Sequence, residues 1–420
     1  MATVACAAGG GSSPGAIAQT NDAAIIPPTH TIDLSLPPQD RYRALALAYK
    51  SELRGLTTLF NGLLNDLGLA YFNGPINLLA RVALRGLNSP VETAELRGIS
   101  SITGIAMYLL VSFNVVLDCL MGCTSGAVKS LEKGQPWSKT TMLHFRTLDW
   151  TMDPLRKILV QLEFVRSRSA SPGQVLARSI TYVGFIGVLT AVREDLSMSL
   201  NFRAMHNANG RSDHMRFYLH HLLVLMGTRQ SISSILRGYL IPEDPEEEHP
   251  KRLEELVEEI PSRQTTACYL AFCDGVSAIV LEKDHETAVV RYSDTFIGVT
   301  NNDNDDDDPR LCKEVTPLEQ IAPRQSGVRA GMEALVEESR DRLDAIAIRW
   351  RACVRKAKKQ SKKEGRDPKS AERKLTVTTD EVIEWVSAYP TTNEQTHFAT
   401  IMDPMSGQIV WTRVYPPPPE

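Results

Sequence analysis

The chain has 420 residues, of which 43% are apolar and 23% are charged, and its formal net charge is −4 at pH 7. These values are close to those of an average globular protein, so they exclude a wholly disordered or fibrous chain. The small negative charge also excludes a global attraction to nucleic acid.

Seven cysteines are few for this length and odd in number. None forms a Cys-x-x-Cys pair or stands near histidines at zinc spacing, so the pattern favours neither a disulfide scaffold nor a metal site. The first 25 residues lack a basic start and a continuous apolar run, and no Asn-x-Ser/Thr sequon occurs. We therefore predict a cytoplasmic protein without a bound metal.

The N-terminal third is predicted to be mostly helical. Residues 1–28 are rich in Gly, Ser and Pro and predict a disordered tail. Residues 30–38 alternate apolar and polar side chains as a short strand does, and residues 40–68 repeat leucine at three- and four-residue spacing as a helix does. Residues 91–122 are predicted to form a second helical stretch.

An apolar run from Ile102 to Met121 holds fifteen apolar residues in twenty and is long enough to cross a bilayer. Asn114 and Asp118 interrupt it, and a central Asp costs about 2.5–3.5 kcal/mol to insert. We favour a buried core segment over a membrane span and keep the span as the alternative.

The chain after Cys123 is predicted to be rich in strands, with helices between them. The segments 142–150, 180–192 and 196–203 are strand-like, and 267–284, 286–301 and 397–415 each look like a pair of strands. Helices are expected at 216–240, 243–259, 331–354 and 380–389, and a loop at 303–308. This order predicts an α+β fold.

Cys123 follows a glycine at the end of the apolar run. Arg146 and Asp149 lie three residues apart in a strand-like segment. Taken alone, a buried core cysteine and a solvated strand pair explain these residues better than catalysis does.

Several segments in the same order resemble the acid ceramidase and N-acylethanolamine-hydrolysing acid amidase family. They are HTIDLSLPP, GISSITGI, Cys123-Thr124-Ser125, Arg146-Thr147-Leu148-Asp149, YVGFIGVLTAV, SLNFR, and ACYLAFCDGVSAIVLEKD leading into VTNND. The resemblance spans about residues 28 to 415. It implies an N-terminal nucleophile hydrolase with stacked antiparallel sheets between helical layers and a helical N-terminal region.

The resemblance further implies that the chain cuts itself between Gly122 and Cys123. The α-chain-like region 29–122 and the β-chain-like region 123–420 would stay associated. The freed Cys123 would attack the amide bond of an N-acylated lipid, either a ceramide or an N-acylethanolamine. Such a cysteine can lose its proton to its own α-amine, so no histidine, metal or organic cofactor is needed.

Other roles follow position by position from the same resemblance. Asp149 is expected to hydrogen-bond the new α-amine, and Arg146 is expected to lie beside the thiol. Asn301, in VTNND, is expected to donate to the oxyanion, although a turn role also explains it. A second arginine is expected at Arg342, with Arg340 as the alternative.

Tyr182, Val183 and Gly184 are expected to line the pocket, although a core strand explains them equally well. The family has an acidic residue where this chain has Phe202, so a non-catalytic, unprocessed lipid-binding protein stays open as an alternative. A hydrolase or acyltransferase of smaller acyl amides is the other alternative. Family members are usually secreted or lysosomal, which differs from the cytoplasmic prediction above.

Residues 349–374 carry twelve Lys or Arg and three Asp or Glu, a net charge of +9. A solvated, partly helical insertion is the simplest interpretation. Attraction to an anionic membrane surface comes next, and it suits a lipid substrate. Binding to nucleic acid is not expected, because Trp350 is the single aromatic residue within the tract.

Overall fold

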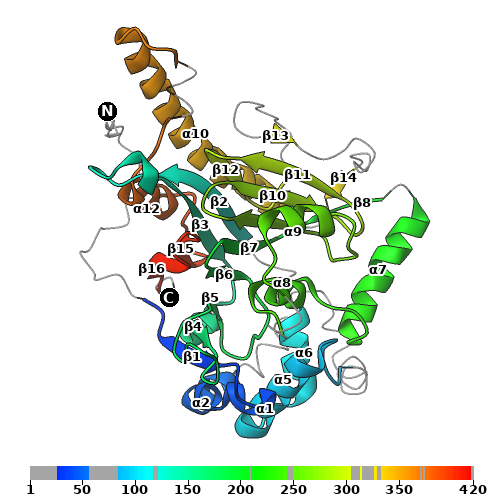
Figure 1. Ribbon diagram of the computed structural model, residues 1–420. Helices are drawn as coiled ribbons and strands as arrows, with labels where there is room; N and C mark the ends of the chain where they lie inside the picture. The colour runs from blue at the N-terminus through cyan, green and yellow to red at the C-terminus, as the bar shows by residue number, and fades with distance from the viewer. Residues whose placement is uncertain are drawn as a thin grey trace.

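The computed structural model describes residues 26–55, 84–116, 122–208, 210–243, 249–303, 313–314, 326–328, 333–368, 371 and 374–417. Within these residues, two β-sheets lie face to face between helices (Figure 1). The α+β fold with stacked sheets between helical layers, as expected from the sequence, is confirmed. Most of the expected tail, the second half of the helix at 40–68 and the loop after residue 303 lie outside the described residues.

The larger sheet has nine strands in the described part of the chain, in the order β1-β4-β5-β6-β7-β9-β10-β11-β13. Neighbouring strands are antiparallel except that β1 runs parallel to β4. The strands are β1 (Thr29–Asp33), β4 (Leu159–Val165), β5 (Ala177–Tyr182), β6 (Thr190–Arg193), β7 (Leu196–Phe202), β9 (Cys268–Cys273), β10 (Ala278–Lys283), β11 (Ala288–Ser293) and β13 (Lys313–Glu314).

The smaller sheet has the order β12-β2-β3-β15-β16 and is antiparallel throughout. Its strands are β2 (Gly122–Ser130), β3 (Thr141–Asp149), β12 (Phe296–Val299), β15 (Thr396–Asp403) and β16 (Gln408–Val414). A separate two-stranded pair joins β8 (Met205–Asn207) to β14 (Ser326–Val328).

The layer between the two sheets is built from small and medium side chains. Ala127 and Met142 from the smaller sheet meet Tyr269, Ala271 and Val280 from the larger one in a single buried cluster. Small residues let two sheets approach closely, so β2, which carries Cys123, is buried on both faces.

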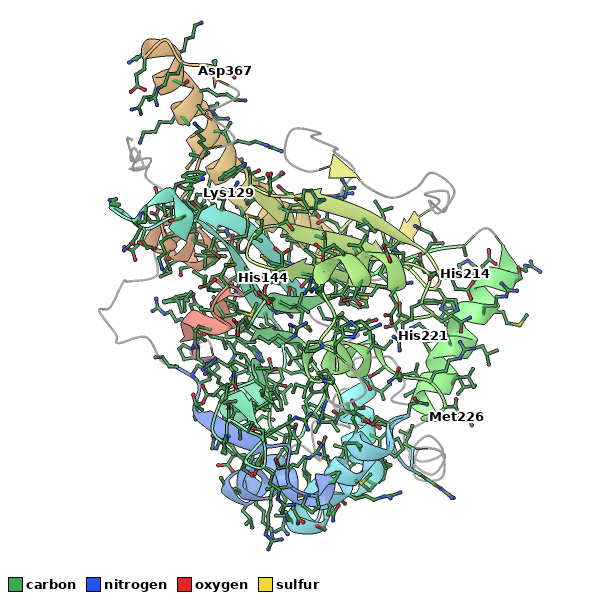
Figure 2. The ribbon with its side chains drawn as sticks, in the orientation of Figure 1. Lys129, His144, His214, His221, Met226 and Asp367 are labelled. Atoms are coloured by element: carbon green, nitrogen blue, oxygen red, sulfur yellow. The ribbon has the colours of Figure 1, made fainter. Side chains whose placement is uncertain are left out.

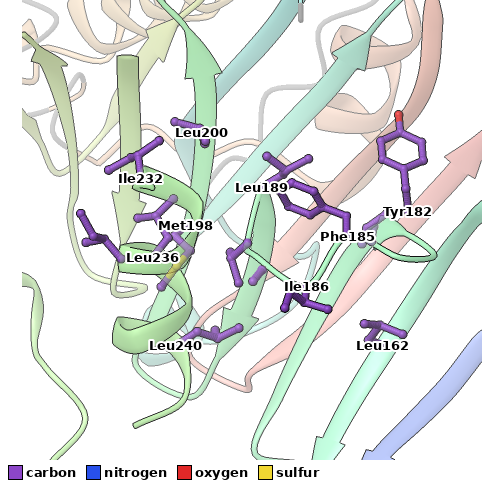
Figure 3. Packing of buried hydrophobic residues seen from close by; sticks show 14 of the residues in the cluster. Leu162, Tyr182, Phe185, Ile186, Leu189, Met198, Leu200, Ile232, Leu236 and Leu240 are labelled. Carbon is purple, nitrogen blue, oxygen red and sulfur yellow. The ribbon is translucent and has the colours of Figure 1, made fainter. Parts of the chain in front are cut away.

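Helices cover both outer faces of the pair of sheets. On the larger sheet, α8 places Ile232, Leu236 and Leu240 against Met198 and Leu200 of β7 (Figure 3). The helices of this side are α1 (Pro38–Arg41), α2 (Arg43–Ala48), α5 (Pro90–Thr103), α6 (Met107–Val116), α7 (Arg211–Leu225), α8 (Ile232–Leu240) and α9 (Leu253–Glu259). The smaller sheet is covered by α10 (Glu333–Lys363) and α12 (Thr379–Ser387). Two 3₁₀ turns lie at Trp137–Lys139 and Asp153–Ile158.

The described part of the apolar run forms the end of α5, a break and α6. The break is at Gly104, whose φ of +77° is readily adopted by glycine. Asn114 is buried within α6, where its Nδ2 donates to the carbonyl oxygens of Leu110 and Gly184. Among the described residues, no helix is both long and apolar enough to span a membrane.

A buried ion pair joins the N-terminal region to the rest of the fold. The Arg237 guanidinium of α8 donates to both carboxylate oxygens of Glu95 on α5, at 2.6 and 2.7 Å. Arg41 donates to the same carboxylate at 3.0 Å. Two cations on one carboxylate compensate its removal from water.

Five sequence expectations need correction. The segment 180–192 is two strands, β5 and β6, and not one, while 286–301 is not a strand pair, because β11 pairs with β10 and β12 pairs with β2. The helix expected through Gly122 does not include it, since Gly122 begins β2. The helix expected at 216–240 is divided into α7 and α8, and α10 runs on into the basic tract.

We expect the free energy of unfolding to decrease as the pH falls from 7 to 5. His144 lies in the interior (Figure 2), and each ring nitrogen of His144 and His397 has a hydrogen-bond partner. Burial lowers the pKa of both side chains to about 3. An unfolded histidine titrates near pH 6.5, so each histidine gains a proton on unfolding at pH 5, which costs about 2 kcal/mol of stability.

Urea unfolding at pH 7, 6 and 5 measures this dependence. The variant His249→Gln, at an exposed position, should keep it unchanged. A free energy of unfolding that stays constant across this range would contradict the expectation.

Candidate active site

Cys123 is the second residue of β2, and its side chain is fully buried. Gly122 pairs with Asp149 and Cys123 pairs with Leu148 in the antiparallel ladder between β2 and β3. This register brings Asp149 beside the Gly122–Cys123 peptide bond, although the two segments are far apart in the chain. In the uncut chain the thiol has no contact with solvent.

Arg146 lies beside the thiol, as expected. Its Nη2 is 3.3 Å from the Cys123 Sγ, and its Nη1 donates to the Oδ1 of Asn201 at 3.0 Å. Burial raises the pKa of the Cys123 thiol, and the Arg146 guanidinium opposes that rise by favouring the thiolate. Arg146 is itself buried, so the alternative of a solvated strand pair is wrong.

Asp149 is held between a hydroxyl and a guanidinium. Thr396 donates to its Oδ1 at 2.7 Å, and the Arg342 Nε lies 3.6 Å from its Oδ2. Burial raises the pKa of the Asp149 carboxyl, while the Arg342 charge opposes the rise. The carboxylate therefore has a fixed position next to the peptide bond before Cys123.

Asn301 lies against Cys123 through its carboxamide oxygen. The backbone N–H of Cys123 donates to the Asn301 Oδ1 at 2.7 Å, and Arg342 Nη2 donates to the same oxygen at 3.0 Å. The Asn301 Nδ2 donates to the carbonyl oxygen of Phe202 at 2.8 Å. Two donors on the oxygen and an acceptor on the nitrogen fix the carboxamide with its Oδ1, and not its Nδ2, toward Cys123. The expected donation to an oxyanion is therefore not seen in the uncut chain.

The two arginine candidates on α10 differ in their exposure to solvent. Arg342 is 2% exposed and contacts both Asp149 and Asn301. Arg340 is exposed on the same helix. The structure therefore brings Arg342, and not Arg340, into the cluster.

Tyr182, Val183 and Gly184 are all buried, but they face different neighbours. The Tyr182 hydroxyl donates to the His397 Nδ1 at 2.8 Å. Burial raises the pKa of its phenol, Cys123 adds to that rise and the Arg146 charge opposes it. Gly184 has φ of +90° and binds Asn114 on α6 through its carbonyl oxygen. Tyr182 thus lies near the cluster, whereas Gly184 contacts helix α6.

Phe202 contributes its backbone to the site and its side chain to the core. Its carbonyl oxygen accepts from Asn301, while its ring packs with Ala204 and Val336 in a small apolar cluster. The contact with Asn301 does not depend on which side chain stands at this position.

Several residues of the cluster were not predicted from the sequence. Asn201 lies within SLNFR, where only the departure at Phe202 was noted, and it accepts from both Arg146 and Ser125. Ser125 lies within the Cys123-Thr124-Ser125 segment, but no role was assigned to it. No local signal in the sequence marks the other residues, which are Ser339, Thr396 and His397.

In the part of the chain that the structure describes, no group of His, Cys, Asp and Glu side chains is arranged to hold a metal ion. The polar cluster around Cys123 offers guanidinium, carboxamide and hydroxyl groups instead. Such groups can stabilise a thiolate and a developing oxyanion.

Comparisons with known proteins give a consistent result. Residues 26–85 match the family model described as the beta subunit of N-acylethanolamine-hydrolyzing acid amidase. Acid ceramidase of Rattus norvegicus is 28% identical over 194 residues, covering 42% of this chain and 45% of that protein. Uncharacterized protein R632 of Acanthamoeba polyphaga mimivirus is 22% identical over 294 residues, covering 68% of this chain and 82% of that protein.

Among solved structures, a Caenorhabditis elegans N-acylethanolamine-hydrolyzing acid amidase ortholog matches with a TM-score of 0.44 and 17% identity, covering 70% of this chain and all of that chain. The chain matches less than half the length of the acid ceramidases. The family-model match and the ceramidase matches confirm the resemblance expected from the sequence: parts of the chain are similar to proteins of the acid ceramidase and N-acylethanolamine-hydrolysing acid amidase family.

Proposed function

We propose that the protein is an amidohydrolase that cleaves the amide bond of an N-acylated lipid, a ceramide or an N-acylethanolamine. The nucleophile is Cys123, freed as an N-terminus by cleavage after Gly122. The observation that carries the proposal is one buried cluster in which Arg146 contacts the Cys123 thiol and Asn301 contacts its backbone nitrogen. The relationship to ceramidases and amidases supports the substrate class.

Self-cleavage begins when the deprotonated Cys123 Sγ attacks the carbonyl carbon of Gly122. The peptide C–N bond breaks, the leaving nitrogen takes up the proton that the thiol has lost, and a thioester links the Gly122 carbonyl carbon to the Cys123 sulfur. Water then hydrolyses the thioester and leaves a carboxylate on Gly122 and a free α-amine on Cys123. The Asn301 oxygen, which accepts from the scissile N–H, supports this step by holding the leaving nitrogen.

In turnover, the Cys123 α-amine takes the thiol proton, and the thiolate attacks the acyl carbon of the substrate. Asn301 stabilises the oxyanion, Arg146 favours the thiolate, and Asp149 orients the α-amine. The amine product leaves with a proton from the α-amine, and water releases the fatty acid from the thioester. In this proposal Cys123, Arg146, Asp149 and Asn301, together with water, supply the groups that each step uses.

The two chains stay associated after cleavage. Strand β1 belongs to the first chain and pairs with β4 of the second along all five of its residues. The ion pair between Glu95 and Arg237 joins the same two chains in the core. Separating the chains would expose both contacts to water.

Intact-mass analysis combined with an amidase assay tests the proposal. A cut chain with a new N-terminus at Cys123 and release of fatty acid from ceramide or N-acylethanolamine support it. An uncut chain that binds these lipids without hydrolysis would instead support the non-catalytic alternative. Turnover of short acyl amides alone would support the other alternative, a hydrolase or acyltransferase of smaller acyl amides.

The basic tract begins as part of the core and ends as a cationic projection. Trp350, Cys353 and Val354 pack under the smaller sheet. Beyond them α10 continues to Lys363 away from the body of the fold (Figure 1), and Asp367 lies near its tip (Figure 2). We propose that this end of α10 attracts the protein to anionic membranes and has no role in binding nucleic acid.

Replacing Lys359, Lys362 and Lys363 by glutamine should weaken binding to vesicles containing phosphatidylserine at low salt by about a hundredfold. All three side chains are exposed on α10. Each contributes about 1 kcal/mol near an anionic surface, and salt screens the attraction. Vesicle co-sedimentation at two salt concentrations measures the effect, and turnover of a soluble short-chain amide should not change.

A matched control places the same three charge losses elsewhere. Lys133, Lys139 and Lys157 are exposed outside the tract. Their replacement by glutamine should weaken binding far less. If the two triple variants weaken vesicle binding equally, the tract is a solvated insertion without a membrane role.

A further inference from the structure

Helix α10 reaches the active-site cluster with two polar side chains one turn apart, Ser339 and Arg342. Arg342 contacts the Asn301 carboxamide, as described above. Ser339 contacts the Asn301 backbone instead, and nothing in the sequence singled it out as functional.

The Ser339 hydroxyl is fully buried and uses both of its hydrogen-bonding roles. It accepts from the backbone N–H of Asn301 at 2.6 Å and donates to the Asn302 Oδ1 at 2.6 Å. Thr300 donates to the same Asn302 oxygen at 2.9 Å. One hydroxyl from a helix thereby orders the backbone and a side chain of the segment that carries Asn301.

The residues around Asn301 need such a contact because they lie beyond the end of strand β12. The pairing of β12 with β2 ends at Val299, opposite Ser125. Asn301 follows two residues later and is fully buried. The Asn301 backbone N–H lies beyond the end of this ladder, and the Ser339 hydroxyl accepts from it, as a buried backbone donor requires.

The position of this backbone decides where the carboxamide lies. The Asn301 Oδ1 is 2.7 Å from the Cys123 backbone nitrogen, so a small displacement of the Asn301 backbone would move the carboxamide away from the reacting residue. A misplacement of about 1 Å can cost about a hundredfold in rate.

We propose that Ser339 is a positioning residue that sets the place of Asn301 relative to Cys123. The proposal rests on the amidase function proposed above. Ser339 does not touch the reacting atoms and acts through Asn301 alone.

Ser339→Ala should lower kcat roughly tenfold to a hundredfold at nearly constant KM, because substrate binding does not involve the hydroxyl. Ser339→Thr keeps the hydroxyl and should recover most of the activity. Ser339→Cys keeps the shape of the side chain with a somewhat larger atom and hydrogen-bonds weakly, so it should resemble Ser339→Ala even if the alanine variant folds poorly.

Ser361→Ala is the matched control. Ser361 is a buried serine on the same helix, and its hydroxyl donates to the Asp367 carbonyl oxygen at 3.2 Å, outside the active-site cluster. This variant should keep the wild-type kcat. An equal loss of kcat in Ser339→Ala and Ser361→Ala, or an effect confined to KM, would overturn the proposal.

Crystal structures separate this proposal from the proposed function. In a Cys123→Ala background, which keeps the chain uncut, adding Ser339→Cys should lengthen the distance from the Asn301 Oδ1 to the backbone nitrogen of position 123 by more than about 0.5 Å. An unchanged distance would overturn the positioning role. If the wild type hydrolyses no acyl amide, the proposed function fails, and the distance still decides the role of Ser339.

Discussion

Cys123→Ala should leave the protein as one chain of 420 residues and abolish amide hydrolysis, whereas the wild type should appear as fragments of 122 and 298 residues. The sulfur is the nucleophile in both reactions, and alanine has no group that can replace it. Intact-mass spectrometry detects the fragments, and Edman sequencing of the larger fragment should begin at Cys123. The loss of turnover should exceed about a thousandfold, since the covalent route is lost entirely.

Cys273→Ala is the control for the loss of a buried thiol. Cys273 is a free, fully buried cysteine between the two sheets, with its thiol directed at the Met142 carbonyl oxygen. This variant should still cut itself and hydrolyse substrate. A wild-type protein that hydrolyses lipid amides while fully intact would contradict the N-terminal nucleophile mechanism.

Asn301→Ala should lower kcat by roughly a hundredfold to a thousandfold with little change in KM. The carboxamide loses its contact with the Cys123 nitrogen and its role at the oxyanion, and both matter most in the transition state. The same variant should cut itself more slowly, which a time course of intact mass after refolding measures.

Asn88→Ala separates this role from that of an ordinary loop asparagine. Asn88 is exposed, and its Nδ2 donates to the carbonyl oxygen of Gly227 at 3.4 Å, outside the active-site cluster. Its loss should reduce stability slightly and leave kcat unchanged. If Asn301→Ala behaves in the same way, or changes KM alone, Asn301 has a turn role and the oxyanion assignment is wrong.

The parts of the fold that were predicted correctly are those with local patterns. The hairpin of β15 and β16 was recognised because alternating residues flank a Pro-to-Gly turn, and Gly407 takes a positive φ there. The assignment of β11 and β12 to one pair failed because adjacency in sequence does not determine sheet membership. Burial of Phe296 against Trp350 places β12 in the other sheet.

The candidate site was only partly accessible from the sequence for a similar reason. Arg146 and Asp149 lie in one of the segments that resemble the family, and the resemblance placed them beside Cys123. Asn201 and Ser339 are joined to the cluster by contacts that span tens of residues along the chain, and serine and asparagine are common in loops and at helix ends. Only the stacking of the sheets and the path of α10 reveal them.

The parallel pairing of β1 with β4 affects how this protein can fold and refold. Before cleavage, β1 reaches β4 as part of one chain, so folding is unimolecular and independent of concentration. The proposed cleavage would place β1 and β4 in different chains, so recovery from a denatured state would become a bimolecular reaction. The edge of β4 would be unpaired in the separated second chain and could aggregate. Such a cut protein would persist through slow unfolding, and only the uncut chain would hold all the segments needed for folding as one molecule.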